Sequence, residues 1–229
     1  MSVYAFGPAI ADIFAQPQRV FQAIIEKTLS AWVPLIVVFV SSLAVFGWYF
    51  MTVDMEAFII AAAAQSGTAM TPETLVAIRD QTALLRITTL LSSVVSQVGI
   101  PFVIALYCSL VANVVSDVRS SYGQWLAVVA WSSIPGLISL LSMAISIAIA
   151  QDGAVAIESL DRTTLNNLAF HFNPQDAGYV AANAVSLGSL WSWLISVLGF
   201  SLLAKVSTRT AALLLLAPIV FMSLLVWLL

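Results

Sequence analysis

Charged residues are scarce in this sequence. Only 8% of its 229 residues are Asp, Glu, Lys or Arg, whereas 61% are hydrophobic. Water-soluble globular domains carry about 25% charged residues, so this composition excludes a soluble globule and indicates a protein that crosses a membrane several times. The eight basic residues are scattered and the formal net charge is -3. Because a nucleic-acid-binding surface needs clustered Lys and Arg, no nucleic-acid partner is expected.

Cysteine and histidine are nearly absent, with one of each at Cys108 and His171. A single cysteine excludes an internal disulfide and a CxxC metal or redox motif, and the apolar run around Cys108 predicts a packing role. A membrane hydrolase needs a nucleophile with a base, or a metal with its ligands, and His171 lies in a polar segment. We therefore expect no enzyme, no cofactor and no metal site. No predicted span carries a charged residue, which argues against proton-coupled transport.

Long apolar runs dominate what remains. A bilayer core about 30 Å thick is crossed by about 20 apolar residues in a helix, and the uncharged stretch from Ser120 to Ala150 exceeds that length. Five such runs predict an all-α membrane protein, a single domain built as a bundle of five transmembrane helices. The predicted spans are residues 31–51, 88–115, 124–150, 181–204 and 211–229.

Residues 1–30 precede the first span and predict an amphipathic helix broken near Pro17, without a cleavable signal peptide of the usual form. We expect Ile13, Phe14 and Phe21 to form its apolar, membrane-facing stripe. Two interpretations stay open. The helix lies in the headgroup plane, or it packs against the underside of the bundle.

Two polar segments between the spans are predicted to be exterior loops with helical content. Thr71-Pro72-Glu73 reads as an N-cap, a proline at the first helical position and an early acid, so a helix should begin at Pro72 and run unbroken into the second span. Asn173-Pro174-Gln175-Asp176 repeats the pattern and predicts a helix that begins at Pro174 and becomes the fourth span.

Charge counts predict the orientation. The amino-terminal segment and the two short links carry five basic and three acidic residues, and the two longer segments carry three basic and eight acidic residues. By the positive-inside rule, the amino terminus is cytoplasmic and the carboxyl terminus is exterior.

Polar residues and prolines inside the spans are the candidate site residues. A primary amide in hydrocarbon needs partners, so Gln97 and Asn113 predict either an interhelical clamp or a ligand cavity between kinked helices. The full set comprises Gln97, Asn113, Pro101, Pro135, Ser132, Ser133 and Asn183. Charged and aromatic residues of the links are candidates for cytoplasmic partner docking, with plain surface solvation as the alternative. They are Asp117, Arg119, Tyr122, Lys205 and Arg209.

Three segments in order resemble the bacterial form of the Yip1 domain family: PQRVFQAI at residues 17–24, SSYGQWLAVVAWSSIPGLI at 120–138 and LWSWLISVLGFSLLAKVSTRTAALLL at 190–215. Tyr122, Gly123 and Pro135 match the family's third-span entry, and Ser207, Arg209 and Ala211 match its last link. The resemblance implies an integral protein of a bacterial inner, or plasma, membrane. Eukaryotic members of the family bind prenylated Rab GTPases, but their acidic tyrosine-glycine-proline motif is absent, since residues 25–35 read IEKTLSAWVPL.

Two functions follow as hypotheses. The first is a non-enzymatic membrane-organising or adaptor protein, whose partners are the lipid bilayer and other membrane proteins or a second copy of the chain. The alternative is a small-molecule or lipid transporter with a site between the kinked spans two, three and four.

Overall fold

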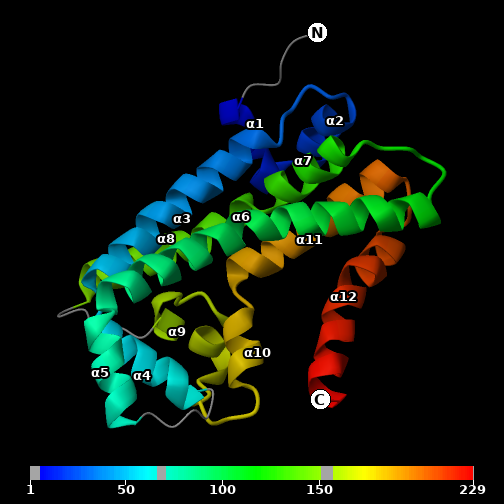
Figure 1. Ribbon diagram of the computed structural model, residues 1–229. Coiled ribbons are helices and arrows are strands. Elements are labelled where there is room, and N and C mark those ends of the chain that lie inside the picture. The colour runs from blue at the N-terminus through cyan, green and yellow to red at the C-terminus, as the bar shows by residue number, and fades with distance from the viewer. Residues whose placement is uncertain (1–5, 66–70, 151–156, 229) are drawn as a thin grey trace. The chain divides into compact units, whose positions relative to one another are not determined.

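The computed structural model describes residues 6–65, 71–150 and 157–228, and the regular elements in these ranges are helices (Figure 1). Extended backbone pairs at an isolated antiparallel bridge between Thr164 and Ser186. The chain forms two compact units. The terminal unit holds the residues up to Val37, Gly99–Pro135 and those from Trp191 onward; the central unit holds Val38–Val98 and Gly136–Leu190.

The terminal unit is organised around one buried helix, α7. Its complete helices are α1 (Phe6–Ala15), α2 (Pro17–Ile25), α7 (Tyr122–Ser132) and α12 (Thr208–Leu228), and it shares α3 (Trp32–Thr52), α6 (Thr82–Val115) and α11 (Leu187–Ala204) with the central unit. Every residue of α7 from Trp125 to Ser132 is buried, so the helix is covered on all its faces. A helix that is apolar all round belongs inside a bundle, which is why this segment carries no charge.

Helices α2 and α11 both pack against α7. Figure 1 shows α2 beside α7, and the rings of Trp125 in α7 and Phe200 in α11 lie 5.0 Å apart. The three helices meet at Gly199, where an added Cβ would lie 2.7 Å from both Phe21 Cε1 and Val128 Cγ1. Because no side chain fits at that distance, glycine permits the close approach.

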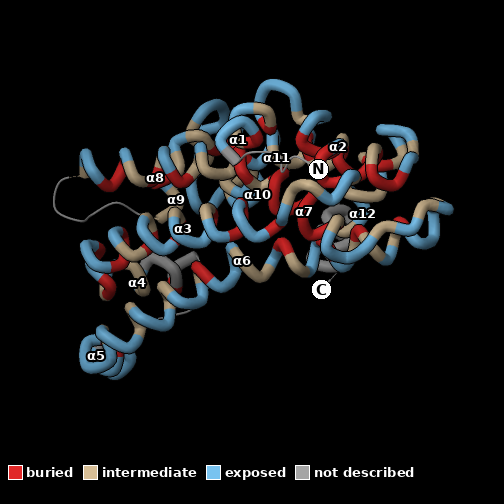
Figure 2. The backbone as a smooth tube through the Cα atoms, turned by 90° about the horizontal axis from the view of Figure 1, so that it is seen from above, coloured by how far each residue is buried: buried red, intermediate tan, exposed pale blue. Residues whose placement is uncertain are grey.

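The central unit has a core of aromatic and aliphatic side chains. It contains α4 (Met55–Gln65), α5 (Pro72–Asp80), α8 (Leu137–Ile149), α9 (Ile157–Leu160), a π-helical turn (Asn166–Phe170) and α10 (Tyr179–Ala184). The core cluster comprises Phe46, Tyr49, Phe50, Val53, Met55, Leu140, Met143, Ile147 and Leu160. Helix α5 lies outside it and is coloured as exposed over nearly all its length in Figure 2.

Four helical segments among the described residues are long and apolar enough to cross a membrane: Trp32–Thr52, Thr82–Val115, Tyr122–Ile149 and Leu187–Ala204. They confirm an all-helical protein with apolar spans in the first four predicted regions. The third segment is interrupted by a 3-10 turn at Ile134–Gly136, where Pro135 was expected to disturb the helix. The fifth span, predicted at 211–229, falls on α12; the total of five stays a prediction, and Leu229 lies outside the described residues.

The second predicted span starts earlier than expected, and the helix before it is separate. Helix α5 does begin at Pro72, with Thr71 Oγ1 accepting from the Thr74 amide at 3.3 Å. It ends at Asp80, however, and α6 begins at Thr82, so the prediction of one unbroken helix is wrong. The Thr82 hydroxyl bonds back to the carbonyl of Ile78 at 3.0 Å, and such local bonds compete with a continuous helix.

The predicted helix start at Pro174 is also wrong. Asp176 Oδ2 accepts from the Asn173 amide at 2.7 Å, so the acid closes a turn instead of capping a helix. Helix α10 begins only at Tyr179, and α11 begins at Leu187 instead of residue 181. The break between them coincides with the bridge from Ser186 to Thr164.

The amino-terminal segment breaks at Pro17, as predicted, into α1 and α2. The predicted membrane-facing stripe is wrong for two of its three residues, since Ile13 and Phe21 are 0% exposed and only Phe14 is exposed. Val20, Phe21, Ala23 and Ile24 form the buried face of α2, which packs against α7. This contact favours the interpretation of packing against the bundle.

Candidate functional site

The outer face of α2 is polar and is held in place by one side chain of α7. Gln18, Arg19, Gln22 and Glu26 are exposed on this helix. On its inner side, Gln124 Nε2 donates to the carbonyls of Ile24 and Ile25 at 3.4 and 3.3 Å. Those carbonyls belong to the last turn of α2, where helical backbone bonds run out. Gln124 therefore fixes the end of α2 against the start of α7.

Gln124 also completes the cap of its own helix. Ser121 Oγ accepts from the Gln124 amide at 3.3 Å, and Gln124 Oε1 accepts from the Ser121 amide at 3.1 Å. The sequence analysis missed Gln124, although Ser121 followed three residues later by Gln is the signature of a capping box. The contact with α2, about 100 residues away, carries no local signal.

The two short links of the chain meet through a second polar contact. Ser116 Oγ donates to the carbonyl of Ala204, the last residue of α11, at 2.5 Å. The link that follows Ser116 carries Asp117 and Arg119, and Ala204 is followed by Lys205, which has a positive φ of 53°. The predicted docking residues Asp117, Arg119, Tyr122, Lys205 and Arg209 all belong to the terminal unit and are all exposed.

We call the exposed face of α2, residues 116–121 and residues 205–209 the polar platform. Its basic residues outnumber its acidic ones: Arg19, Arg119, Lys205 and Arg209 against Glu26 and Asp117. Among the described residues, Arg19, Lys205 and Arg209 form no ion pair, and Arg119 donates to Asn113 Oδ1 at 2.8 Å. The platform thus presents cations that no carboxylate among the described residues neutralises.

The amides predicted to lie inside the bundle lie outside it. Gln97 and Asn113 are both exposed on this chain, so they are not buried between its helices, and a role for either in helix clamping or ligand binding stays a prediction. Asn113 Oδ1 instead accepts a hydrogen bond from Arg119, six residues along the chain. The sequence could not assign the face, because apolar residues cover both the lipid-facing and the packed sides of α6.

Pro101, Ser132 and Ser133 belong to the terminal unit, and Asn183 belongs to the central unit. Pro101 and Ser132 are buried, and Ser132 Oγ has no hydrogen-bond partner within the part of the chain that the structure describes. Ser133 Oγ donates to the Ala130 carbonyl at 2.7 Å. In the central unit, Asn183 Oδ1 accepts from Thr164 Oγ1 at 3.5 Å. These contacts are the local and interhelical bonds that pack helices.

A stripe of hydroxyls on α8 holds the polar segment around Arg162. Ser142 Oγ accepts from the Arg162 amide at 3.0 Å, and Ser146 Oγ accepts from its Nε at 3.2 Å. Ser139 pairs with Ser186 at 2.8 Å. The spacing of three and four residues places Ser139, Ser142 and Ser146 on one helix face.

An ion pair joins α4 and α5 in the central unit. Arg79 donates from Nε and Nη2 to the two carboxylate oxygens of Glu56, each at 2.7 Å. The hydrogen bond from Arg79, with its charge, lowers the pKa of Glu56 below its ordinary value. Burial and the carboxylate of Glu158 raise the pKa of Tyr179 above its ordinary value.

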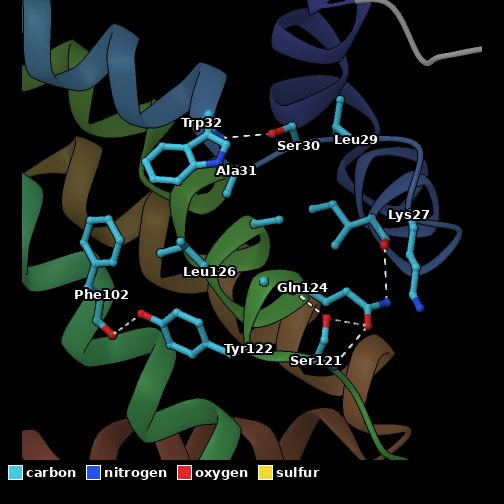
Figure 3. Close-up of a pocket in the computed structure, with 13 residues that line it drawn as sticks. Lys27, Leu29, Ser30, Ala31, Trp32, Phe102, Ser121, Tyr122, Gln124 and Leu126 are labelled. Carbon is cyan, nitrogen blue, oxygen red and sulfur yellow. Dashed lines mark hydrogen bonds between the residues drawn. The ribbon is translucent and has the colours of Figure 1, made fainter.

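A pocket of about 460 Å³ lies at the start of α3 and α7 in the terminal unit (Figure 3). The connector from Lys27 to Trp32, the first turns of α7 and Phe102 of α6 form its wall. Tyr122 Oη donates to the carbonyl of Phe102 at 3.2 Å. In the described ranges, no group of three or more His, Cys, Asp or Glu side chains could hold a metal ion.

Comparison with protein families decides the identity. A family model for the Yip1 domain matches residues 11–229, nearly the whole chain. The chain belongs to the Yip1 domain family. Neither the comparison with curated proteins nor the comparison with solved structures gives a match. Family membership and the apolar helices together make this Yip1-family chain an integral membrane protein.

Proposed function

We propose that this Yip1-family protein is a non-enzymatic membrane adaptor whose polar platform binds a partner protein with an acidic surface. Complementary charge steers association and selects partners, and the platform carries an excess of exposed cations. The proposed orientation places the platform on the cytoplasmic side, since its short links hold the basic residues that the positive-inside rule counts.

The observation that carries the proposal is the fixation of the platform by two side chains. Gln124 ties α2 to α7, and Ser116 ties one short link to the end of α11. A charged surface that is already rigid loses little conformational entropy when a partner binds. Flexible links that serve only to connect spans would not need these bonds.

The test is site-specific photo-crosslinking in membranes with a photoreactive phenylalanine analogue at Gln22, on the exposed face of α2. The matched control carries the same analogue at Leu110, an apolar residue of α6 that is 59% exposed. We expect a discrete protein adduct from position 22 and none from position 110. Salt at about 1 M, which shortens the Debye length to about 3 Å, should weaken the adduct.

Charge reversal sharpens the experiment. Arg19→Glu and Arg209→Glu place acids in the first turns of α2 and α12, where the helix dipole favours them, so the fold should tolerate both changes. The double glutamine variant, Arg19→Gln with Arg209→Gln, should give a weaker adduct than the wild type. The double glutamate variant, Arg19→Glu with Arg209→Glu, should give the weakest adduct of the three. An adduct of undiminished intensity in the double glutamate variant would contradict the proposed adaptor surface.

A further inference from the structure

The pocket at the start of α3 and α7 has two chemically different sides. Figure 3 shows the rings of Trp32 and Tyr122, with Phe102, on one side of the view and Lys27, Ser121 and Gln124 on the other. The polar atoms of Ser121, Gln124 and Tyr122 are already hydrogen-bonded within the protein. Lys27 makes no ion pair within the described residues, so it is the free polar group of the pocket.

Lys27 is held at the pocket by the end of α2. Its φ of 58° is left-handed, its amide donates to the Ile24 carbonyl at 3.0 Å, and the next amide, of Thr28, donates to the Ala23 carbonyl at 2.9 Å. This pair of bonds is the helix-ending motif that usually employs glycine or asparagine. A lysine there brings a cation to the pocket at a modest cost in backbone strain.

The pocket also lies where two spans begin. Trp32 is the first residue of α3 and Tyr122 the first of α7, and both head candidate membrane spans. They are 62% and 40% exposed. Exposed Trp and Tyr at span ends mark the headgroup level of a bilayer, where one end of the ring is wet and the other apolar. The mouth of the pocket therefore faces phospholipid headgroups.

We propose that this pocket binds an anionic glycerophospholipid, with the phosphate region at Lys27 and the first acyl carbons against the aromatic side. The charge of Lys27 complements an anionic headgroup, and the apolar wall formed by Trp32, Phe102 and Leu126 suits the glycerol and chain carbons. A volume of about 460 Å³ lies within the range of ligand pockets, about 300 to 1,000 Å³. The proposal goes beyond the adaptor function and does not depend on it.

The experiment titrates the purified full chain, in a neutral detergent, with phosphatidylglycerol and with phosphatidylcholine of the same acyl chains. Bound lipid is counted by native mass spectrometry, and the thermal midpoint is followed in parallel. Glycerol 1-phosphate, which has the headgroup chemistry without acyl chains, is a third probe. We expect phosphatidylglycerol to bind more tightly than phosphatidylcholine and to raise the midpoint, and glycerol 1-phosphate to have no effect at the same concentration.

Two lysine variants provide the matched test. Lys27→Asn removes the cation while asparagine still tolerates the left-handed backbone. Lys205→Asn makes the same change at a second lysine with positive φ, at the end of α11, which does not line the pocket. One lysine near an anionic surface corresponds to about fivefold in affinity, so Lys27→Asn should weaken phosphatidylglycerol binding by about that factor and Lys205→Asn should leave it unchanged.

A filling variant gives a second, independent measurement. Gly123 lines the pocket, and a Cβ there would meet only Ser121 Oγ at 3.9 Å, so Gly123→Leu should fold normally and reduce the binding of phosphatidylglycerol. Equal affinity for the two lipids, equal effects of the two asparagine variants, or stabilisation by glycerol 1-phosphate alone would each overturn the proposal. Crosslinking of a peptide or protein at Trp32 in place of lipid would overturn it as well.

Discussion

Replacing Gly199 with alanine should push α11 away from α2 and α7. The new Cβ would lie 2.7 Å from Phe21 Cε1 and Val128 Cγ1, whereas carbon atoms in contact are normally about 3.5 to 4.0 Å apart. Phe21 is 0% and Val128 3% exposed, so neither side chain can move into solvent. The two side chains or the helices that carry them must shift.

The magnitude follows from two opposing effects. Overpacking a buried site costs about 1 to 3 kcal/mol, and a clash on two sides at 2.7 Å belongs near the upper end. Alanine in place of glycine within a helix contributes about 1 kcal/mol in the other direction. We therefore expect a net loss of about 2 kcal/mol.

The controls are Gly47→Ala in α3 and Gly99→Ala in α6, because neither Cβ would meet a heavy atom within 4 Å. Both should be as stable as the wild type or up to about 1 kcal/mol more stable. Thermal midpoints of the purified proteins in one detergent measure the order. The double variant Gly199→Ala with Val128→Ala should recover part of the loss, since it removes the clash with one of the two side chains. A Gly199→Ala protein as stable as the Gly99→Ala protein would refute the close approach at this position.

Further predictions concern a clamp, an ion pair and an exposed amide. Gln124→Glu keeps the acceptor of the capping box but loses the donor to α2. Trypsin should therefore cleave at Arg19 faster, by a factor that corresponds to about 1 kcal/mol. Gln124→Asn should restore part of the protection. The lowered pKa of Glu56 means that its pairing with Arg79 stabilises the α4–α5 contact fully above the ordinary pKa of 4.5 and is lost as the pH falls through the lower folded value. A spin label at Val76 should gain mobility in that acid range in the wild type. Mobility that does not change with pH would contradict the expected loss of the Glu56–Arg79 ion pair in acid. Gln97→Leu should leave the thermal midpoint unchanged or raise it, because the exposed amide has no hydrogen bond among the described residues; a clear drop would show that it has a structural partner.

The spans were predictable because the requirement that defines them is one-dimensional. Crossing the hydrocarbon core takes about 20 apolar residues in a row, and that can be counted from the sequence without knowledge of neighbours. Helix α3, at Trp32–Thr52, illustrates this success.

The start of α5 at Pro72 was predictable for a second reason. A cap and a proline act within one turn, so the local pattern at Thr71 contains the whole cause.

Prediction failed where one local pattern suits two structures. The cap, proline and acid at residues 173–176 resemble those at 71–73, yet Asp176 bonds back to Asn173 and forms a turn. The prediction that Gln97 is buried failed for a different reason. Gln97 lies in a helix with apolar residues on every side, and periodicity cannot distinguish a side that faces lipid from a side that faces protein.

The contacts that sequence reasoning missed share a purpose, which is to satisfy the carbonyls at helix ends. Gln124 donates to the last turn of α2, Ser116 donates to the last carbonyl of α11, and Arg86 donates to the carbonyls of Phe50 and Val53 at the end of α3. Each donor lies between 33 and 100 residues from its acceptor, so no local pattern announces it.

The need to satisfy carbonyls at helix ends also explains which polar residues are left to bind a partner. Carbonyls at a helix end lack intrahelical donors, and a bilayer offers few waters to replace them, so polar residues near span ends are first engaged by neighbouring helices. Arg86 has this role, which accounts for a charge inside α6 without any chemistry. Arg19, Lys27 and Arg209 donate to no such carbonyl and pair with no carboxylate in the described part of the chain. Because no carboxylate or helix-end carbonyl among the described residues engages these three cations, we expect their charge to be available to a partner surface or to a lipid headgroup.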